Sequence, residues 1–178
     1  MKVMGIDAST NSLAYGIIED GTLIDHGEFF FEGTDINKRL INAHEKTMDH
    51  IDLFDVDVIV FEKAVKVRSI DVAIKMAEFF GAIKAVIMKG SDVYMVTPLT
   101  WQKAIGNPSI LGKEKVQWVR ARPELKTKSQ IYTAIRKYRK QITMDWVEKN
   151  YGVKAANDNI SDAIAIAYYG HEKVNGKT

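Results

Sequence analysis

The sequence contains no cysteine, which excludes disulfide bonds, thiolate metal sites and a cysteine nucleophile. This composition fits a reducing cytoplasm. The four histidines are scattered, and no two of them have the spacing of metal ligands, so we interpret them as structural or surface residues. No apolar run reaches the roughly 18 residues that a membrane span requires, so no membrane partner is expected.

A length of 178 residues, with 46% hydrophobic and 27% charged side chains, predicts one soluble globular domain over residues 1–178. The chain begins with a predicted strand rather than a signal peptide. No repeat, low-complexity tract or linker divides the sequence.

The net charge of +2 conceals two regions of opposite sign. Residues 1–62 carry four basic and thirteen acidic residues, a net charge of −9, whereas residues 113–140 carry ten basic and two acidic residues, a net charge of +8. A phosphate polymer would be attracted to the second region and divalent cations to the first. Two solvated faces would give the same pattern, so charge alone does not decide the function.

Hydrophobic periodicity predicts strands and helices in an order typical of an α/β fold. The expected strands are 2–7, 13–19, 23–31, 56–61 and 93–96. The expected helices are 35–53, 69–88, 113–120, 129–149 and 160–169, with the short third helix inside a charged loop at 106–128 and a disordered tail at 172–178. The order predicts a mixed five-stranded sheet, its first three strands antiparallel, flanked by helices.

The second expected helix, 69–88, is apolar almost all round. We therefore expect it to be largely buried. Gly81 lies in its middle at a cost of about 1 kcal/mol against alanine, and close packing against the sheet is the expected reason.

Carboxylates stand at three places that such a fold would bring together. Asp7 ends the first strand, Glu62 follows the fourth, and Asp158 and Asp162 open the last helix four residues apart, on one helix face. Singly, each has an ordinary explanation as a strand-end residue, a surface pair with Lys63 or a helix cap. Together they would repel one another unless cations lay among them.

Oxygen ligands without sulfur suit Mg²⁺, with Mn²⁺ as a substitute. Two such ions about 4 Å apart can activate a water and stabilise the leaving oxygen of an in-line phosphoryl displacement. This chemistry needs no histidine or cysteine nucleophile, so the lack of a nucleophile motif is expected.

Four sequence blocks resemble the RuvC-type Holliday junction resolvases of the RNase H-like superfamily. They are Gly5-Ile6-Asp7-Ala8-Ser9 with Ala14–Ile18, Phe61-Glu62 with Gly81-Ala82-Ile83, Thr97-Pro98 through Trp101, Lys103 and Gly106 to Lys113–Gln117, and Asp162-Ala163-Ile164-Ala165-Ile166-Ala167. The last block is the most specific. The resemblance covers about residues 2–118 and 155–170.

The resemblance implies a homodimeric endonuclease of the cytoplasm, bacterial or, for a phage-encoded protein, of the host. It would resolve four-way or other branched DNA by paired symmetric nicks with two Mg²⁺ ions, in recombination, repair or phage DNA processing. Asp7, Glu62, Asp158 and Asp162 would hold the metal, and Lys113 would act near the scissile phosphate. The family usually has Asp or His at the position of Asn159, so Asn159 is the alternative ligand to Asp158. This departure suggests a divergent, phage-type member.

Basic residues in two regions are the candidate DNA contacts. They are Lys63, Lys66, Arg68, Lys113, Lys115, Arg120, Arg122, Arg136, Arg139 and Lys140. Arg136, Arg139 and Lys140 have the spacing of one helix side. The same fold also hosts nucleases of RNA or flap DNA, and a non-catalytic nucleic-acid-binding module is a further alternative. An actin-like ATPase would need a second domain and a longer chain.

Overall fold

The computed structural model describes residues 1–51, 55–63, 69–87 and 91–176. The strands are β1 (Lys2–Ala8), β2 (Ser12–Glu19), β3 (Thr22–Phe30), β4 (Val58–Glu62) and β5 (Asp92–Val96). The helices are α1 (Ile36–Ile51), α2 (Ile70–Ile87), α3 (Pro98–Ala104), α4 (Gly112–Arg120), α5 (Lys128–Tyr151) and α6 (Asp158–Val174). Within the described residues, none of these helices is both long and apolar enough to span a membrane.

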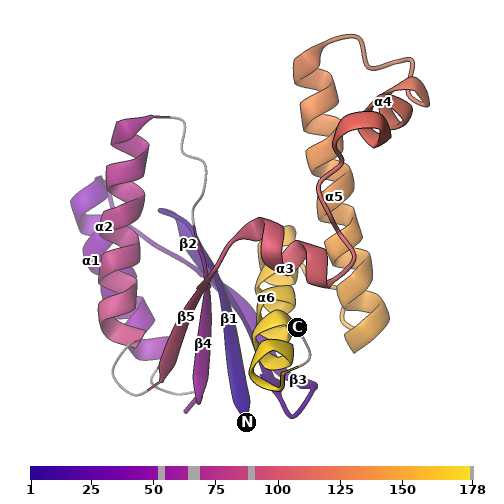
Figure 1. The fold of residues 1–178 in the computed structure, drawn as a ribbon. Coiled ribbons are helices and arrows are strands. Elements are labelled where there is room, and N and C mark those ends of the chain that lie inside the picture. The colour runs from indigo at the N-terminus through magenta and orange to yellow at the C-terminus, as the bar shows by residue number, and fades with distance from the viewer. Residues whose placement is uncertain (52–54, 64–68, 88–90, 177–178) are drawn as a thin grey trace.

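The five strands form one mixed sheet in the order β3-β2-β1-β4-β5. β1, β2 and β3 are antiparallel neighbours, whereas β4 and β5 run parallel to β1. Helices cover both faces, with α1 and α2 on one side and α6, α3 and α5 on the other (Figure 1). The predicted mixed five-stranded α/β fold is confirmed.

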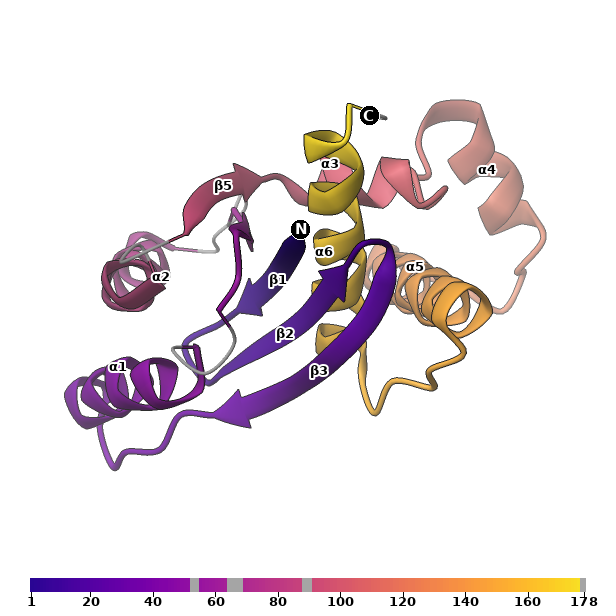
Figure 2. The same ribbon diagram turned by 90° about the horizontal axis from the view of Figure 1, so that it is seen from below.

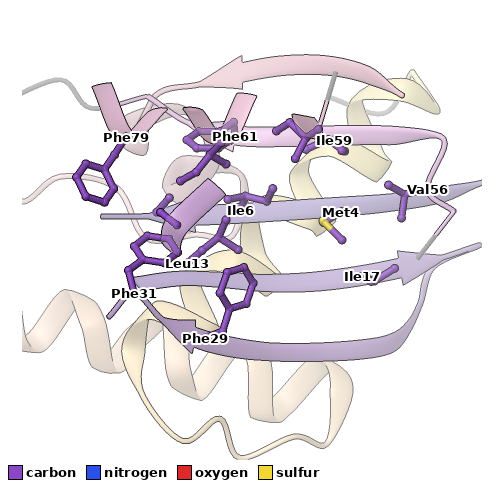
Figure 3. Packing of buried hydrophobic residues seen from close by; sticks show 14 residues of the cluster. Met4, Ile6, Leu13, Ile17, Phe29, Phe31, Val56, Ile59, Phe61 and Phe79 are labelled. Atoms are coloured by element: carbon purple, nitrogen blue, oxygen red, sulfur yellow. The ribbon is translucent and has the colours of Figure 1, made fainter. Parts of the chain in front are cut away.

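The face toward α1 and α2 holds the larger apolar cluster. Alternate strand residues such as Ile6, Leu13 and Phe61 point to this face because successive side chains of a strand alternate between the two sides. They meet Phe79 and Ile83 of α2, and Figure 3 shows this packing from close by. All five side chains are fully buried, so this cluster fixes the register of the sheet.

The opposite face lets α6 lie directly on the sheet. A Cβ on Gly5 of β1 would stand 2.2 Å from Ala163 O and Ala167 N, and one on Gly16 would stand 2.7 Å from Ile164 Cα. Only glycine permits this approach. The alternating alanines of the last sequence block are therefore the contact side of α6, and they hold its N-terminal turn beside the end of β1.

Helix α2 departs from its expected environment. Phe79, Ile83, Val86 and Ile87 are buried, but Ile74 is 52% exposed. The exposed side includes Ile70, Val72, Ile74, Ala77, Gly81 and Ala85. A Cβ on Gly81 would meet nothing within 4 Å, so the prediction of close helix–sheet packing there was wrong. The apolar pattern of the helix is real, but this chain alone covers only one side of it.

Helix α4 and the N-terminal half of α5 project beyond the sheet, on the side of α6 away from α1 and α2 (Figures 1 and 2). Trp118 of α4 contacts Tyr138 of α5, with ring centroids 5.8 Å apart, and the guanidinium of Arg122 lies 3.8 Å from the centroid of the Trp118 ring. This contact joins α4 to α5. At the other end of the chain, α6 continues to Val174, beyond the expected start of the tail at 172.

Candidate active site

Three residues form a row across the sheet on the α6 side. Asp7 is paired with Ala14 of β2, and Ala14 is paired with Glu28 of β3. Directly opposed residues of neighbouring strands share a face, so Glu28, Ala14 and Asp7 all point toward α6. Glu62 extends the row, since β4 runs parallel to β1 with Phe61 beside Ile6. The small Ala14 in the middle leaves room for the first turn of α6.

Asp7 and Glu62 of this row line a cavity of about 260 Å³ at the end of the sheet, which residues of α5 and α6 also line. Its lining residues are Asp7, Ala8, Ser9, Ser12, Glu62, Arg136, Lys140, Asp158, Asn159 and Asp162. All four predicted carboxylates, together with the alternative ligand Asn159, thus share one cavity. Two basic residues of α5 line the same space, which gives it both a cation-binding and an anion-binding side.

Glu62 is held in place by a tryptophan of the third resemblance block. Trp101 of α3 is fully buried, and its indole Nε1 donates a hydrogen bond of 2.6 Å to Glu62 Oε2. α3 begins at Pro98, where proline suits the first helical position, and this places Trp101 on the turn facing β4. A fixed carboxylate oxygen is pre-organised for binding a cation.

The clustered carboxylates disfavour one another's ionised form and so raise one another's pKa values. Burial raises the pKa of Asp7 to about 6, to which the charge of Glu28 contributes, while Lys140 lowers it. Burial, reinforced by the charge of Asp7, raises the pKa of Glu62 to about 7, against the lowering effect of the Trp101 hydrogen bond. Burial and the charges of Asp7 and Glu62 raise the pKa of Asp162 well above its usual value. A bound cation would relieve this repulsion, so the donor set fits a hard divalent metal.

Lys140 supplies a positive charge within the cluster. Its Nζ forms a close ion pair with Asp158 Oδ2. Burial and the charge of Arg136 lower the pKa of Lys140, while Asp162 and Asp7 oppose that shift. Across the described ranges, no three acidic or histidine side chains converge as tightly as a metal site requires. The carboxylates would therefore have to move closer together to share one ion, and Asp158 could bind it only by giving up its lysine partner.

The other predicted DNA contacts lie in several different places. Arg139 does not share the cavity with Arg136 and Lys140, because its guanidinium donates to Gln102 Oε1 at 2.6 Å and to Asn107 O at 2.9 Å. It ties α5 to the α3 region. Lys113, predicted to act near the scissile phosphate, is exposed on α4 and does not line the cavity.

The other predicted DNA-contacting residues do not line the cavity or lie outside the described residues. Lys115 and Arg120 are exposed on α4, and Lys63 is exposed at the end of β4. Lys66 and Arg68 lie outside the described residues. Sequence reasoning missed the contact of Trp101 with Glu62 and the place of Glu28 near Asp7, because neither residue carries a local signal for a distant neighbour.

A comparison with family models then identifies the chain. Residues 3–136 match the model for the crossover junction endodeoxyribonuclease RuvC. The chain belongs to the RuvC family. No curated protein matches the chain.

Solved RuvC structures extend the likeness to the whole chain. Thermus thermophilus RuvC in complex with a Holliday junction substrate has a TM-score of 0.71 and 18% identity, covering 99% of this chain and 98% of that one. A second structure of Thermus thermophilus RuvC has a TM-score of 0.69, with the same identity and coverage. The RuvC-type fold predicted from sequence is thereby confirmed. It includes α6 with Asp162, which lies beyond the family-model match.

Proposed function

We propose that this RuvC-family protein is a Holliday junction resolvase that nicks phosphodiester bonds at the cavity described above. The observation that carries the proposal is the meeting of Asp7, Glu62 and Asp162 in one cavity that Arg136 and Lys140 also line. A similar fold in Thermus thermophilus RuvC was solved with a Holliday junction substrate. For a bacterial or phage-encoded member, the proposed site of action is the cytoplasm.

The carboxylates are the proposed holders of two Mg²⁺ ions, with Mn²⁺ as a substitute. When bound, such ions would activate a water and stabilise the leaving oxygen of the phosphodiester. The products that the family resemblance implies have 5′-phosphate and 3′-hydroxyl ends. The charge of Asp7 raises the pKa of both Glu62 and Asp162, so Asp7 is close to both and is the central carboxylate of the proposed metal site. Trp101 keeps Glu62 Oε2 in position through its 2.6 Å hydrogen bond.

Arg136 and Lys140 are the proposed phosphate contacts nearest to the reaction. They are four residues apart, so they lie on one side of α5, facing the acidic cluster. α4 and α5 project beyond the sheet (Figure 1). The basic residues on and just after α4 would contact DNA farther from the cleaved bond; they are Lys113, Lys115, Arg120 and Arg122. Because these basic residues lie apart from the carboxylates, DNA binding should persist when the carboxylates are replaced.

Paired nicking requires two active sites, and the exposed side of α2 is the proposed dimer contact. Its apolar and small residues, from Ile70 through Ile74 and Gly81 to Ala85, are spaced along one helix side. Small residues allow two helices to approach closely, and a second copy of the same surface would be self-complementary about a two-fold axis.

A panel of labelled substrates tests this function. We expect cleavage of a four-way junction in Mg²⁺, none in EDTA, and weak or no cleavage of duplex, flap and RNA–DNA hybrid. Preferential cleavage of the flap or hybrid would support the alternative nuclease functions, and junction binding without cleavage would support a non-catalytic module.

A further inference from the structure

Glu28 of β3 holds the first turn of α6 through both of its carboxylate oxygens. Oε2 accepts a hydrogen bond of 2.6 Å from Asn157 Nδ2, and Oε1 accepts one of 2.8 Å from Asn159 Nδ2. Glu28 does not line the cavity, but Asn159 does. The carboxylate therefore contacts a candidate metal ligand without itself lining the cavity.

The chemistry of these groups decides which end of each amide faces Glu28. An ionised carboxylate only accepts hydrogen bonds, so each asparagine must turn its NH₂ group toward it. The oxygen of Asn157 then caps α6 by accepting from Ile160 N at 3.0 Å. The oxygen of Asn159 is turned away from Glu28, on a residue that lines the cavity. An amide oxygen can bind a hard cation, whereas an amide NH₂ cannot.

We propose that Glu28 is a positioning residue that fixes the Asn159 amide with its oxygen toward the catalytic metal. The proposal rests on the proposed function for the identity of that metal. It favours Asn159 over Asp158 as the ligand from the first turn of α6, since Asp158 is paired with Lys140.

The same contact explains why this chain has asparagine where the resemblance implies Asp or His. An aspartate at this position would place its carboxylate about 3 Å from that of Glu28, and two like charges at that distance repel strongly. The amide removes this repulsion and donates a hydrogen bond instead. Glu28 and Asn159 therefore form a matched pair, 131 positions apart in the sequence.

The test is a double-mutant cycle on Mn²⁺ affinity, measured by titration calorimetry on the full chain without DNA. Glu28→Gln keeps the shape of the side chain, but its single amide oxygen cannot accept hydrogen bonds from both asparagines. It should therefore weaken Mn²⁺ binding about 10-fold or more, as expected when a group that orients a metal ligand is lost. Asn159→Ala should weaken binding by a similar factor. If Glu28 acts through Asn159, the double variant should bind within about 2-fold of Asn159→Ala.

A charge swap and a matched control complete the experiment. Glu28→Gln with Asn159→Asp should restore Mn²⁺ binding relative to Glu28→Gln, because the glutamine NH₂ can donate to the new carboxylate. Asp25→Asn removes one charge from the same strand on the opposite face, where Asp25 is paired with Ile17, and should leave Mn²⁺ affinity unchanged. Melting temperatures in EDTA confirm that each variant is folded.

The proposal is overturned if Glu28→Gln binds Mn²⁺ as the wild type does, or if the losses in the double variant multiply. Junction cleavage is assayed in parallel with the wild type. The expected Mn²⁺ pattern without junction cleavage would support the Glu28 proposal and count against the resolvase function. Junction cleavage without that pattern would do the reverse.

Discussion

Replacing Asp7 by asparagine should abolish cleavage and at the same time stabilise the metal-free protein. The side chain lies in a partly buried cluster of like charges, and its pKa is raised from 3.8 to about 6. The folded state therefore binds this proton more tightly than the unfolded chain does. Stability from this group is complete below about pH 4 and is lost as pH rises toward 6.

The size of the effect follows from that pKa difference. About two pKa units correspond to about 3 kcal/mol, because each unit is worth 1.36 kcal/mol. Burying an amide with an imperfectly paired NH₂ offsets about 1 kcal/mol of this gain. The remaining 2 kcal/mol or so predicts a rise in melting temperature of about 4–8 °C for a chain of this size.

The assay is thermal denaturation in EDTA at pH 8 and at pH 4, alongside junction binding and cleavage in Mg²⁺. Asp7→Asn should melt higher than the wild type at pH 8, with the difference vanishing at pH 4. It should bind junctions normally and cleave none. Asp49→Asn, which changes an exposed carboxylate on α1, is the matched control and should alter neither property. An Asp7→Asn variant that cleaves, or that melts no higher than the wild type at pH 8, would refute the reasoning.

Three further predictions concern the supports of the site. Trp101→Phe removes the hydrogen bond that lowers the pKa of Glu62, so the acid limb of the pH–rate profile should move to higher pH; an unmoved limb would contradict this role. Arg136→Ala should flatten the salt dependence of junction binding by about one log unit per log unit of salt, whereas Lys149→Ala, near the other end of α5, should not. Ile74→Asp on the exposed side of α2 should convert a dimer to a monomer in light scattering, and an unchanged mass would exclude that contact.

The sheet and the carboxylate positions could be predicted because their signals are local. Alternating apolar residues define each strand, and Asp7 and Glu62 follow strands that a parallel pairing brings together. The alanine pattern after Asp162 indicates a helix side that can lie on Gly5. Each of these features depends on residues close in sequence, so the positions of Asp7, Glu62 and Asp162 in the site could be predicted from them.

Other features depend on contacts between distant residues, which a single sequence does not reveal. The Trp101–Glu62 and Glu28–Asn159 hydrogen bonds join elements 39 and 131 positions apart. The path of α5 brings Lys140, rather than Lys113, to the cavity, and only tertiary packing decides that path. An apolar helix such as α2 has the same pattern whether its second side meets its own core or another subunit.

Cleavage of a supercoiled plasmid that extrudes a cruciform tests the central claim most directly, because the cruciform presents a four-way junction. A resolvase that makes two nicks within one encounter converts this plasmid to linear DNA, whereas single nicks give open circles. We predict linear product in Mg²⁺ without build-up of open circles, and no product in EDTA. Open circles alone, or an uncut plasmid in Mg²⁺, would contradict the account.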